Sequence, residues 1–306
     1  MVGFNPEPIN GRELSSFEYS EAGLISGIAT RAIIQPLDVL KIRFQLQEEP
    51  MRGIKTGKYT GLFQSIRVIM LEEGYQAFWK GHIPAQGLSA VYGLVQFSSF
   101  EIISKDLAKF EYFRHNKKVL DFFAGAIAGC TAMTAAMPLD VIRTRLVAQG
   151  EPKVYRSTIH AAKKIWRHEK IPGFFRGITP SLAQIAPFTG LQFFLYNYIH
   201  KLWSQYTTYD TTGALFSGAA AGTISKMILY PLDLIRHRLQ VNAFVRRGFG
   251  STTRHKSMVK AIIGIAKKES LFGLFKGLGP SLIKAAANSG CSFLFYEIAC
   301  DILRKA

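Results

Sequence analysis

The chain has 306 residues, a formal net charge of +17, 48% hydrophobic residues and a mean hydropathy of +0.11. Its three cysteines, Cys130, Cys291 and Cys300, are odd in number and scattered, which argues against a metal site or a disulfide framework. A basic nucleic-acid-binding scaffold accounts for the charge and stays as an alternative of a different class. Such a scaffold would rarely carry the long uncharged stretches of this chain.

The first unit of the chain is a pair of long helices. Residues 1–20 show neither a secretory signal nor an Arg-rich transit peptide, so we expect targeting information within the mature chain. Long helices are predicted over 17–46 and 82–105, separated by a polar loop at 48–59 and a short amphipathic stretch. The 19 residues 82–100 carry no charge if histidine is neutral, and about 20 helical residues cross a bilayer core.

The rest of the chain repeats this unit twice. Helices are predicted over 118–147 and 178–202, and then over 212–241 and 278–303, with uncharged stretches of 18 residues (122–139) and 22 residues (178–199). Each polar loop, such as 246–256, lies between the two helices of its own unit, so all loops emerge on one side and both termini on the other. We predict an all-α membrane protein with six transmembrane helices in three pseudo-threefold repeats, 16–109, 117–204 and 211–304.

Three recurring phrases define the repeats. A Pro-Leu-Asp phrase begins at Pro36, Pro138 and Pro231, and a basic residue follows each proline after five positions. A second phrase ends at Gly81, Gly177 and Gly277, with a proline three residues later. A Gly-x3-Gly pattern begins 13 residues before each proline of the first phrase, and small residues four apart let helices approach closely. We therefore expect a shared packing role for these glycines.

The Pro-Leu-Asp phrase predicts a gate. Proline kinks a long helix, and three kinks at one depth make the helix ends converge. The aspartate and the basic residue three positions later lie on adjoining parts of one helix face. We predict that each aspartate pairs with the basic residue of the next helix, that Gln45 and Gln240 brace two of the pairs, and that Val147 leaves the third without a brace. The predicted pairs are Asp38–Arg143, Asp140–Arg236 and Asp233–Lys41. The alternative is three local surface pairs of little energetic weight.

These phrases, which cover essentially the whole chain, resemble the mitochondrial carrier family. The resemblance implies a bundle in the mitochondrial inner membrane with short matrix-side amphipathic helices. It also implies alternation between cytosol-open and matrix-open states, with the predicted pairs as the matrix gate. With it we expect both termini in the intermembrane space, a monomer, cardiolipin as a lipid partner and no cofactor. In this family the second helix of each repeat also carries the sequence pattern aromatic-acidic-x-x-basic. At the basic position of that pattern this chain has Ser104, His200 and Cys300. The cytosolic latch should therefore be weak and the unliganded state cytosol-open.

Four further stretches narrow the resemblance to those family members that exchange thiamine pyrophosphate for nucleotides. They include loop residues that the fold does not require. The stretches are 41–47, 78–86, 148–155 and 230–234.

Residues that break the threefold symmetry predict the substrate site, because a substrate has no threefold symmetry. Arg31 and Lys226 lie five residues before their prolines, and Lys284 lies seven after its glycine. A cation at bilayer depth usually faces an aqueous cavity, although snorkelling to lipid headgroups is the alternative. Three cations imply an anionic substrate. Their uncharged counterparts are Met133, Leu88 and Gln184. The candidates to contact a ring of the substrate are the pair Gln184-Ile185, the polar residues Gln192, Gln96 and Asn288, and the aromatic residues Phe188 and Tyr92.

No enzyme motif is visible in the sequence. It has no Gly-x4-Gly-Lys-Ser/Thr loop, no His/Glu zinc motif and no placeable Ser/His/Asp set. The expectation is a transporter rather than an enzyme. Within transporters, a carrier of another phosphorylated anion, a nucleotide or coenzyme A, stays open.

Overall fold

The computed structural model describes residues 14–49, 57–204, 210–242 and 257–305, which form helices joined by short turns. The predicted loops at 48–59 and 246–256 and the start of the chain lie wholly or partly outside these residues. Six long helices occupy the predicted positions, and their 26 to 32 residues are enough to cross a bilayer. They are α1 (Ser16–Leu46), α3 (His82–Leu107), α5 (Lys117–Ala148), α7 (Ile178–Ser204), α8 (Asp210–Gln240) and α10 (Leu278–Lys305).

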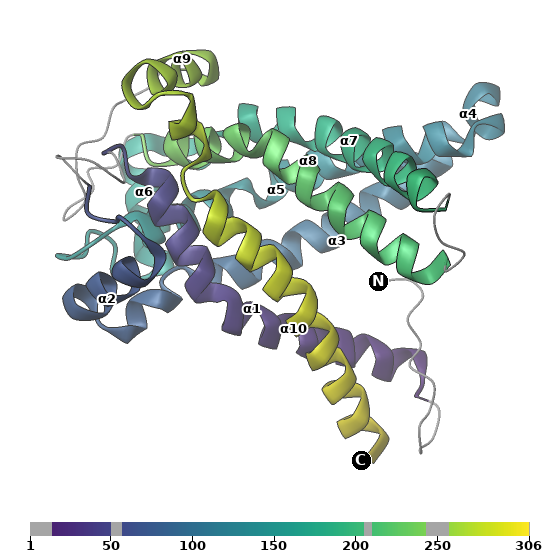
Figure 1. Ribbon diagram of the computed structural model, residues 1–306, viewed down its shortest axis with the longest axis horizontal. Coiled ribbons are helices and arrows are strands. Elements are labelled where there is room, and N and C mark those ends of the chain that lie inside the picture. The colour runs from purple at the N-terminus through teal and green to yellow at the C-terminus, as the bar shows by residue number, and fades with distance from the viewer. Residues whose placement is uncertain (1–13, 50–56, 205–209, 243–256, 306) are drawn as a thin grey trace.

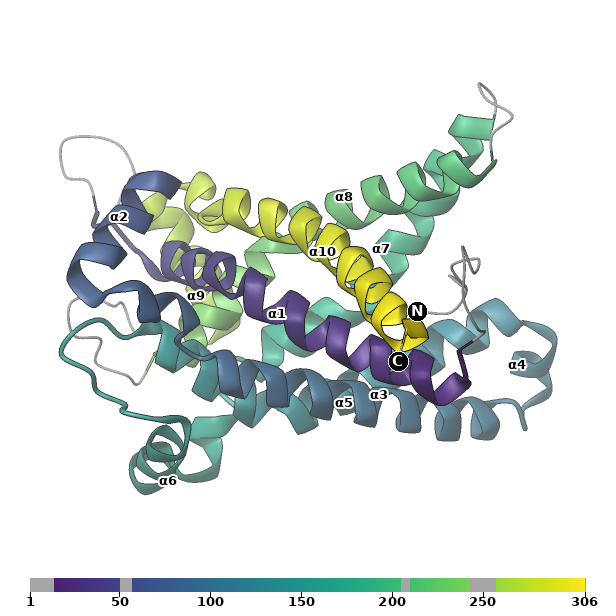
Figure 2. The ribbon, with the colours of Figure 1, turned by 90° about the horizontal axis from the view of Figure 1, so that it is seen from below.

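The short helices within the repeats lie at one end of the bundle, where the long helices converge, whereas α4 lies at the other end (Figures 1 and 2). In each repeat the backbone turns at the same place with a positive φ, at Gly74, Lys170 and Ser270. The turn at Lys170 breaks α6 even though its range is continuous. The short helices are α2 (Leu62–Glu73), η1 (Tyr75–Trp79), α6 (Thr158–Phe174), α9 (Met258–Glu269) and η2 (Leu271–Phe275), with α4 (Glu111–His115) between the first two repeats.

Two of the long helices, over Phe17–Leu46 and Val119–Ala148, are by length and mean hydropathy apolar enough to cross a membrane. The other four are also long, but their polar residues dilute the mean hydropathy. Such dilution is expected of helices that line a polar cavity on one face.

The prolines predicted to kink the long helices lie inside α1, α5 and α8. Pro36 cannot donate to the carbonyl of Ala32 four residues earlier, and the indole Nε1 of Trp79 donates to that oxygen at 3.0 Å. In the first repeat, the carbonyl oxygen left free by the proline therefore accepts a hydrogen bond from a side chain of η1. The other two repeats have phenylalanine in place of Trp79, at Phe175 and Phe275.

The glycine that ends each second phrase is required by the backbone. Gly81, Gly177 and Gly277 have φ of 78°, 80° and 82°, in the left-handed region that favours glycine. A Cβ at these positions would lie 2.8–3.1 Å from the backbone carbonyl oxygen of Arg143, Arg236 or Lys41 on the neighbouring repeat. Glycine thus lets α3, α7 and α10 begin directly against the kinked helices.

The long helices pack in pairs across the repeat boundaries, α3 with α5, α7 with α8 and α10 with α1. Figure 2 shows the pairs spreading apart toward the end at which α1 begins and α10 ends. The role predicted for the Gly-x3-Gly pattern is met only in part. A Cβ at Gly129 would lie 3.0 Å from Ile185, whereas one at Gly23, Gly27, Gly125 or Gly218 would meet nothing within 4 Å. The physical reason is that the pattern lies on the half of the bundle where the pairs diverge.

Candidate functional site

A closed ring of three ion pairs joins α1, α5 and α8 just beyond the kinks. In each pair a nitrogen of the basic side chain lies 2.6 Å from a carboxylate oxygen of the neighbouring helix. The participating side chains are at most 17% exposed, which excludes the alternative of local surface pairs. The pairs are the predicted ones: Arg143–Asp38, Arg236–Asp140 and Lys41–Asp233.

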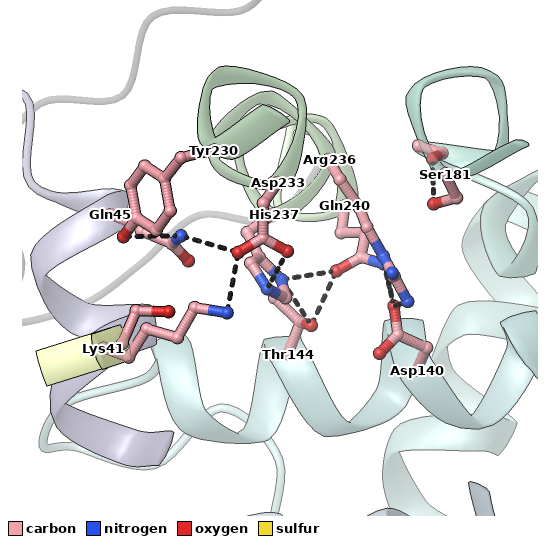
Figure 3. Close-up of polar contacts among 12 residues, drawn as sticks. Lys41, Gln45, Asp140, Thr144, Ser181, Tyr230, Asp233, Arg236, His237 and Gln240 are labelled. Atoms are coloured by element: carbon pink, nitrogen blue, oxygen red, sulfur yellow. Dashed lines mark hydrogen bonds and ion pairs between the residues drawn. The ribbon is translucent and has the colours of Figure 1, made fainter. Parts of the chain in front are cut away.

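Two of the three pairs have a glutamine brace, also as predicted (Figure 3). Gln45 Nε2 donates to Asp233 at 3.1 Å and to the hydroxyl of Tyr230 at 2.9 Å. Gln240 Nε2 donates to Asp140 Oδ2, while its Oε1 accepts from Thr144 at 2.6 Å. Val147 at the third position is buried and apolar.

A second ring of three arginines lies one layer further from the cavity, and sequence reasoning missed it. Arg43, Arg145 and Arg238 each contact both oxygens of a glutamate in their own repeat. Each also donates to carbonyl oxygens at the C-terminal end of the next kinked helix, where a positive charge is favourable. The sequence did contain a pattern that could have revealed this second ring, because these arginines recur seven residues after each proline. The acceptors are Val147 and Gln149 for Arg43, Gln240 for Arg145, and Gln45 and Gln47 for Arg238.

A second cation completes each arginine–glutamate contact. Lys80 Nζ lies 2.5 Å from Glu73, Arg176 Nε lies 2.6 Å from Glu169, and Lys276 Nζ lies 2.5 Å from Glu269. Burial by itself would raise the pKa of Glu73, but hydrogen bonds from Arg43 and Lys80 outweigh it, so the pKa of this carboxyl is lowered. The pKa of Glu169 is lowered by the same balance. Both carboxylates are therefore held ionised at neutral pH.

A cavity of about 590 Å³ lies between the ring of ion pairs and the spreading end of the bundle, and it contains the three predicted cations. Arg31 donates to the carbonyl of Ala85 at 3.0 Å, and Lys226 donates to the carbonyl of Ser281 at 3.1 Å. Lys284 instead forms an ion pair with Asp38 Oδ1. The three cations come from α1, α8 and α10, so they occupy one side of the cavity.

The opposite side of the cavity is apolar and aromatic. It is formed by α3, α5 and α7 through Leu88, Tyr92, Met133, Ile185 and Phe188, with the amide of Gln184 among them. The cavity can therefore receive a molecule with an anionic end and an aromatic end.

Three of the residues predicted to contact a ring of the substrate do not line this cavity. Gln192 and Asn288 are exposed and are not among the residues that line the cavity. Gln192 is eight residues from Gln184, a rotation of about 80° around the helix. Its Nε2 lies 3.7 Å from where a Cβ on Gly222 would be, so it faces α8. Asn288 lies one turn beyond Lys284, further from the ring. Gln96 also lies outside the lining residues.

At the spreading end, the ion pairs Glu101–Lys105 and Asp301–Arg304 each lie within one helix. The ring of His200 stacks on Tyr196 with centroids 5.5 Å apart, and Cys300 is buried beside Ala22. The structure thus has its ring of ion pairs closed and this end open. Within the described residues, no group of three or more His, Cys, Asp or Glu is placed to hold a metal ion.

Comparison with known proteins gives matches over the whole chain. The family model described as mitochondrial carrier protein matches residues 12–111, 114–207 and 208–306. The chain is 43% identical to the mitochondrial thiamine pyrophosphate carrier of Macaca fascicularis, over 99% of this chain and 97% of that protein. It is 42% identical, with the same coverage, to the protein of that name in Homo sapiens. It is 36% identical to the mitochondrial thiamine diphosphate carrier 2 of Zea mays, over 92% of this chain and 93% of that one.

Proposed function

This chain belongs to the mitochondrial carrier family, and from that membership we propose that it transports thiamine pyrophosphate across the mitochondrial inner membrane in exchange for nucleotides. The observation that carries the proposal is the two-sided cavity above the ring of ion pairs. Thiamine pyrophosphate has a diphosphate at one end and aromatic rings at the other. The relatives with 42–43% identity over nearly the full chain carry the name of this substrate.

The cavity suggests how the substrate is held. The diphosphate lies against Arg31, Lys226 and Lys284, since arginine binds phosphate oxygens with two donors and lysine acts as a point charge. The rings lie against Tyr92 and Phe188, which stack on aromatic or cationic groups. Gln184 is placed to hydrogen-bond a ring.

Transport then proceeds by alternating access. In the present state the substrate enters from the open end and meets the closed ring. Opening requires the three ion pairs to separate, and the same residues re-form the ring after release. The matrix gate consists of Asp38–Arg143, Asp140–Arg236 and Asp233–Lys41, with the braces Gln45 and Gln240. This orientation places α2, α6 and α9 on the matrix side and both termini in the intermembrane space.

The protein acts as a monomer, because the ring of ion pairs closes within one chain. Its lipid partner is a cardiolipin bound on the matrix side. Two grooves of about 310 and 400 Å³ support this. The first contains Lys80, Gly81 and Ser157 at the start of α6, and the second contains Arg176, Gly177 and Ser257 at the start of α9. Helix N-termini with a nearby cation favour a phosphate.

Uptake into liposomes tests the proposed function. Wild-type protein should exchange labelled thiamine pyrophosphate and discriminate strongly against unphosphorylated thiamine, which lacks the anionic group. Lys284→Ala should reduce uptake by about 10- to 100-fold, because a charge-assisted hydrogen bond contributes about 1.5–3 kcal/mol. Equal transport of thiamine would contradict the assignment of the three cations. Uptake of nucleotide or coenzyme A without thiamine pyrophosphate would identify a carrier of another phosphorylated anion.

A further inference from the structure

Each of the three gate carboxylates pairs with a cation from a neighbouring helix, but the group that braces this pair is not of the same kind in all three. Asp233 and Asp140 are each braced by one glutamine, and Asp233 also lies 4.0 Å from Nε2 of His237. Asp38 pairs with Arg143 through Oδ2, and the position that supplies the glutamine in the other pairs holds Val147. Its other oxygen, Oδ1, pairs with Lys284 from α10. Lys284, a cation from the cavity wall, thus contacts Asp38 where a glutamine side chain contacts the other two aspartates.

The two kinds of brace differ in their access to a ligand. The side chains of Gln45 and Gln240 are 0% exposed and lie one turn past the gate cations, away from the cavity. The side chain of Lys284 is 27% exposed and lines the cavity. An anion in the cavity can therefore reach the brace of the Asp38–Arg143 pair and neither glutamine.

We propose that Lys284 braces the Asp38–Arg143 pair in the empty carrier and is withdrawn from Asp38 when an anion binds, so that this pair is the first of the three to open. A diphosphate carries more negative charge than one carboxylate and offers more acceptor oxygens, so it competes for the ammonium group. The inference rests on the proposed function only for the identity of that anion as a diphosphate.

The other two cavity cations provide the contrast. Arg31 and Lys226 donate to helix carbonyl oxygens, and the ion pairs of the described residues do not join either of them to a gate carboxylate. They can attract the same anion without loosening a gate pair. Removing Arg31 should therefore weaken binding alone, whereas removing the charge of Lys284 should uncouple binding from the gate.

The test measures access to a buried position on the matrix side of the gate in the full-length carrier. Cys130, Cys291 and Cys300 are replaced by serine, and Leu46→Cys, at a site 1% exposed, serves as the reporter. Its labelling by a reagent on the matrix side is timed with and without saturating inorganic pyrophosphate. The ligand should raise the labelling rate by about tenfold, the size expected for one charge-assisted hydrogen bond.

Lys284→Gln keeps a hydrogen-bonding side chain near Asp38 but removes the charge by which an anion attracts it, so the response to pyrophosphate should disappear. Arg31→Gln is the matched control, since it removes one cavity cation as well. It should need more pyrophosphate and then give the full response at saturation. An unchanged response in Lys284→Gln, or an equal loss in both variants, would overturn the proposal.

Val147→Gln tests the same idea from the other side of the gate, with Val147→Leu as its volume control. A brace beyond the reach of the ligand should reduce the pyrophosphate response by about tenfold and leave pyrophosphate affinity unchanged. An undiminished response in folded Val147→Gln would count against the proposal; if this variant does not insert, the comparison of Lys284→Gln with Arg31→Gln decides. A parallel arm uses thiamine pyrophosphate. If it neither binds nor is transported while pyrophosphate gives the Lys284-dependent response, the proposed substrate is wrong and the coupling stands.

Discussion

Reversing the charges of one gate pair tests the ring of ion pairs directly. Asp140 is 3% exposed, so Asp140→Arg sets a second buried cation beside Arg236. Breaking a buried pair costs about 3–5 kcal/mol, because the remaining charge is left uncompensated. If that cost falls on the closed state during each cycle, transport should drop by about 100- to 5,000-fold. Adding Arg236→Asp restores the opposed charges and should recover most of the activity.

The same swap at Asp38 and Arg143 should recover less, because the structure places Lys284 on the other oxygen of Asp38. An arginine at position 38 would face Lys284 as a like charge. Two unit charges 4 Å apart repel by about 4 kcal/mol at an effective dielectric of about 20. Water in the cavity screens part of this, since Lys284 is 27% exposed. The rescue should still be poorer by about tenfold or more.

The assay is uptake of labelled thiamine pyrophosphate by proteoliposomes, normalised to inserted protein. Asp106→Lys with Lys109→Asp is the control, because this pair is exposed, links the last turn of α3 to the residues just after it and should tolerate reversal. Equal rescue of the two gate swaps would refute the assignment of Lys284 to Asp38. Failure of the Asp140/Arg236 swap in correctly inserted protein would refute the ring itself.

Three further predictions concern stability. Arg145→Ala should strongly lower the melting temperature in detergent, because the lost side chain is 0% exposed and its removal leaves Glu169 short of a partner. Breaking such a buried pair costs about 3–5 kcal/mol. A shift no larger than that of Lys105→Ala, at an exposed site, would contradict this. Trp79→Phe should destabilise the first repeat by about 1 kcal/mol through loss of the hydrogen bond to Ala32, and calorimetry finding no change would show that the carbonyl is satisfied otherwise. The pKa values of Glu73 and Glu169 are lower in the folded protein than in the unfolded chain, so both carboxylates stabilise the fold. Their contribution is fully present at pH values above the unfolded-state pKa of about 4.3. This stability is lost as the pH falls through the lower folded-state values, and Glu73→Gln should flatten the acid limb of a melting-temperature profile.

Much of the ring could be predicted from the sequence because the chain repeats itself. Asp38 and Arg143 are more than 100 residues apart, yet threefold recurrence places both at known depths on equivalent helices. Helical periodicity then fixes the face on which each lies. The kinks, the three ion pairs and the glutamine braces follow from these two regularities together.

The residues that depart from symmetry were predicted less well. Lys284 was expected at the cavity, but its contact with Asp38 depends on how α10 is tilted against α1 and α5. Gln192 and Asn288 were placed in the cavity because they are polar in an uncharged stretch. A rotation of about 80° around the helix axis, or a shift of one helical turn along it, is enough to move such a residue out of the cavity wall. The polarity of a residue in the sequence does not indicate its position on the helix to within such a rotation or shift.

By itself the sequence determined six helices, three kinks and the order in which their charges pair, because local periodicity and repetition carry that information. Only the tertiary structure decided which groups share a partner. The carbonyl oxygens that Arg43, Arg145 and Arg238 contact, the indole that satisfies Ala32, and the lysine that replaces a missing glutamine at Asp38 are contacts between different helices. Such contacts depend on helix tilt and rotation at the scale of a hydrogen bond, which residue spacing along one helix does not specify.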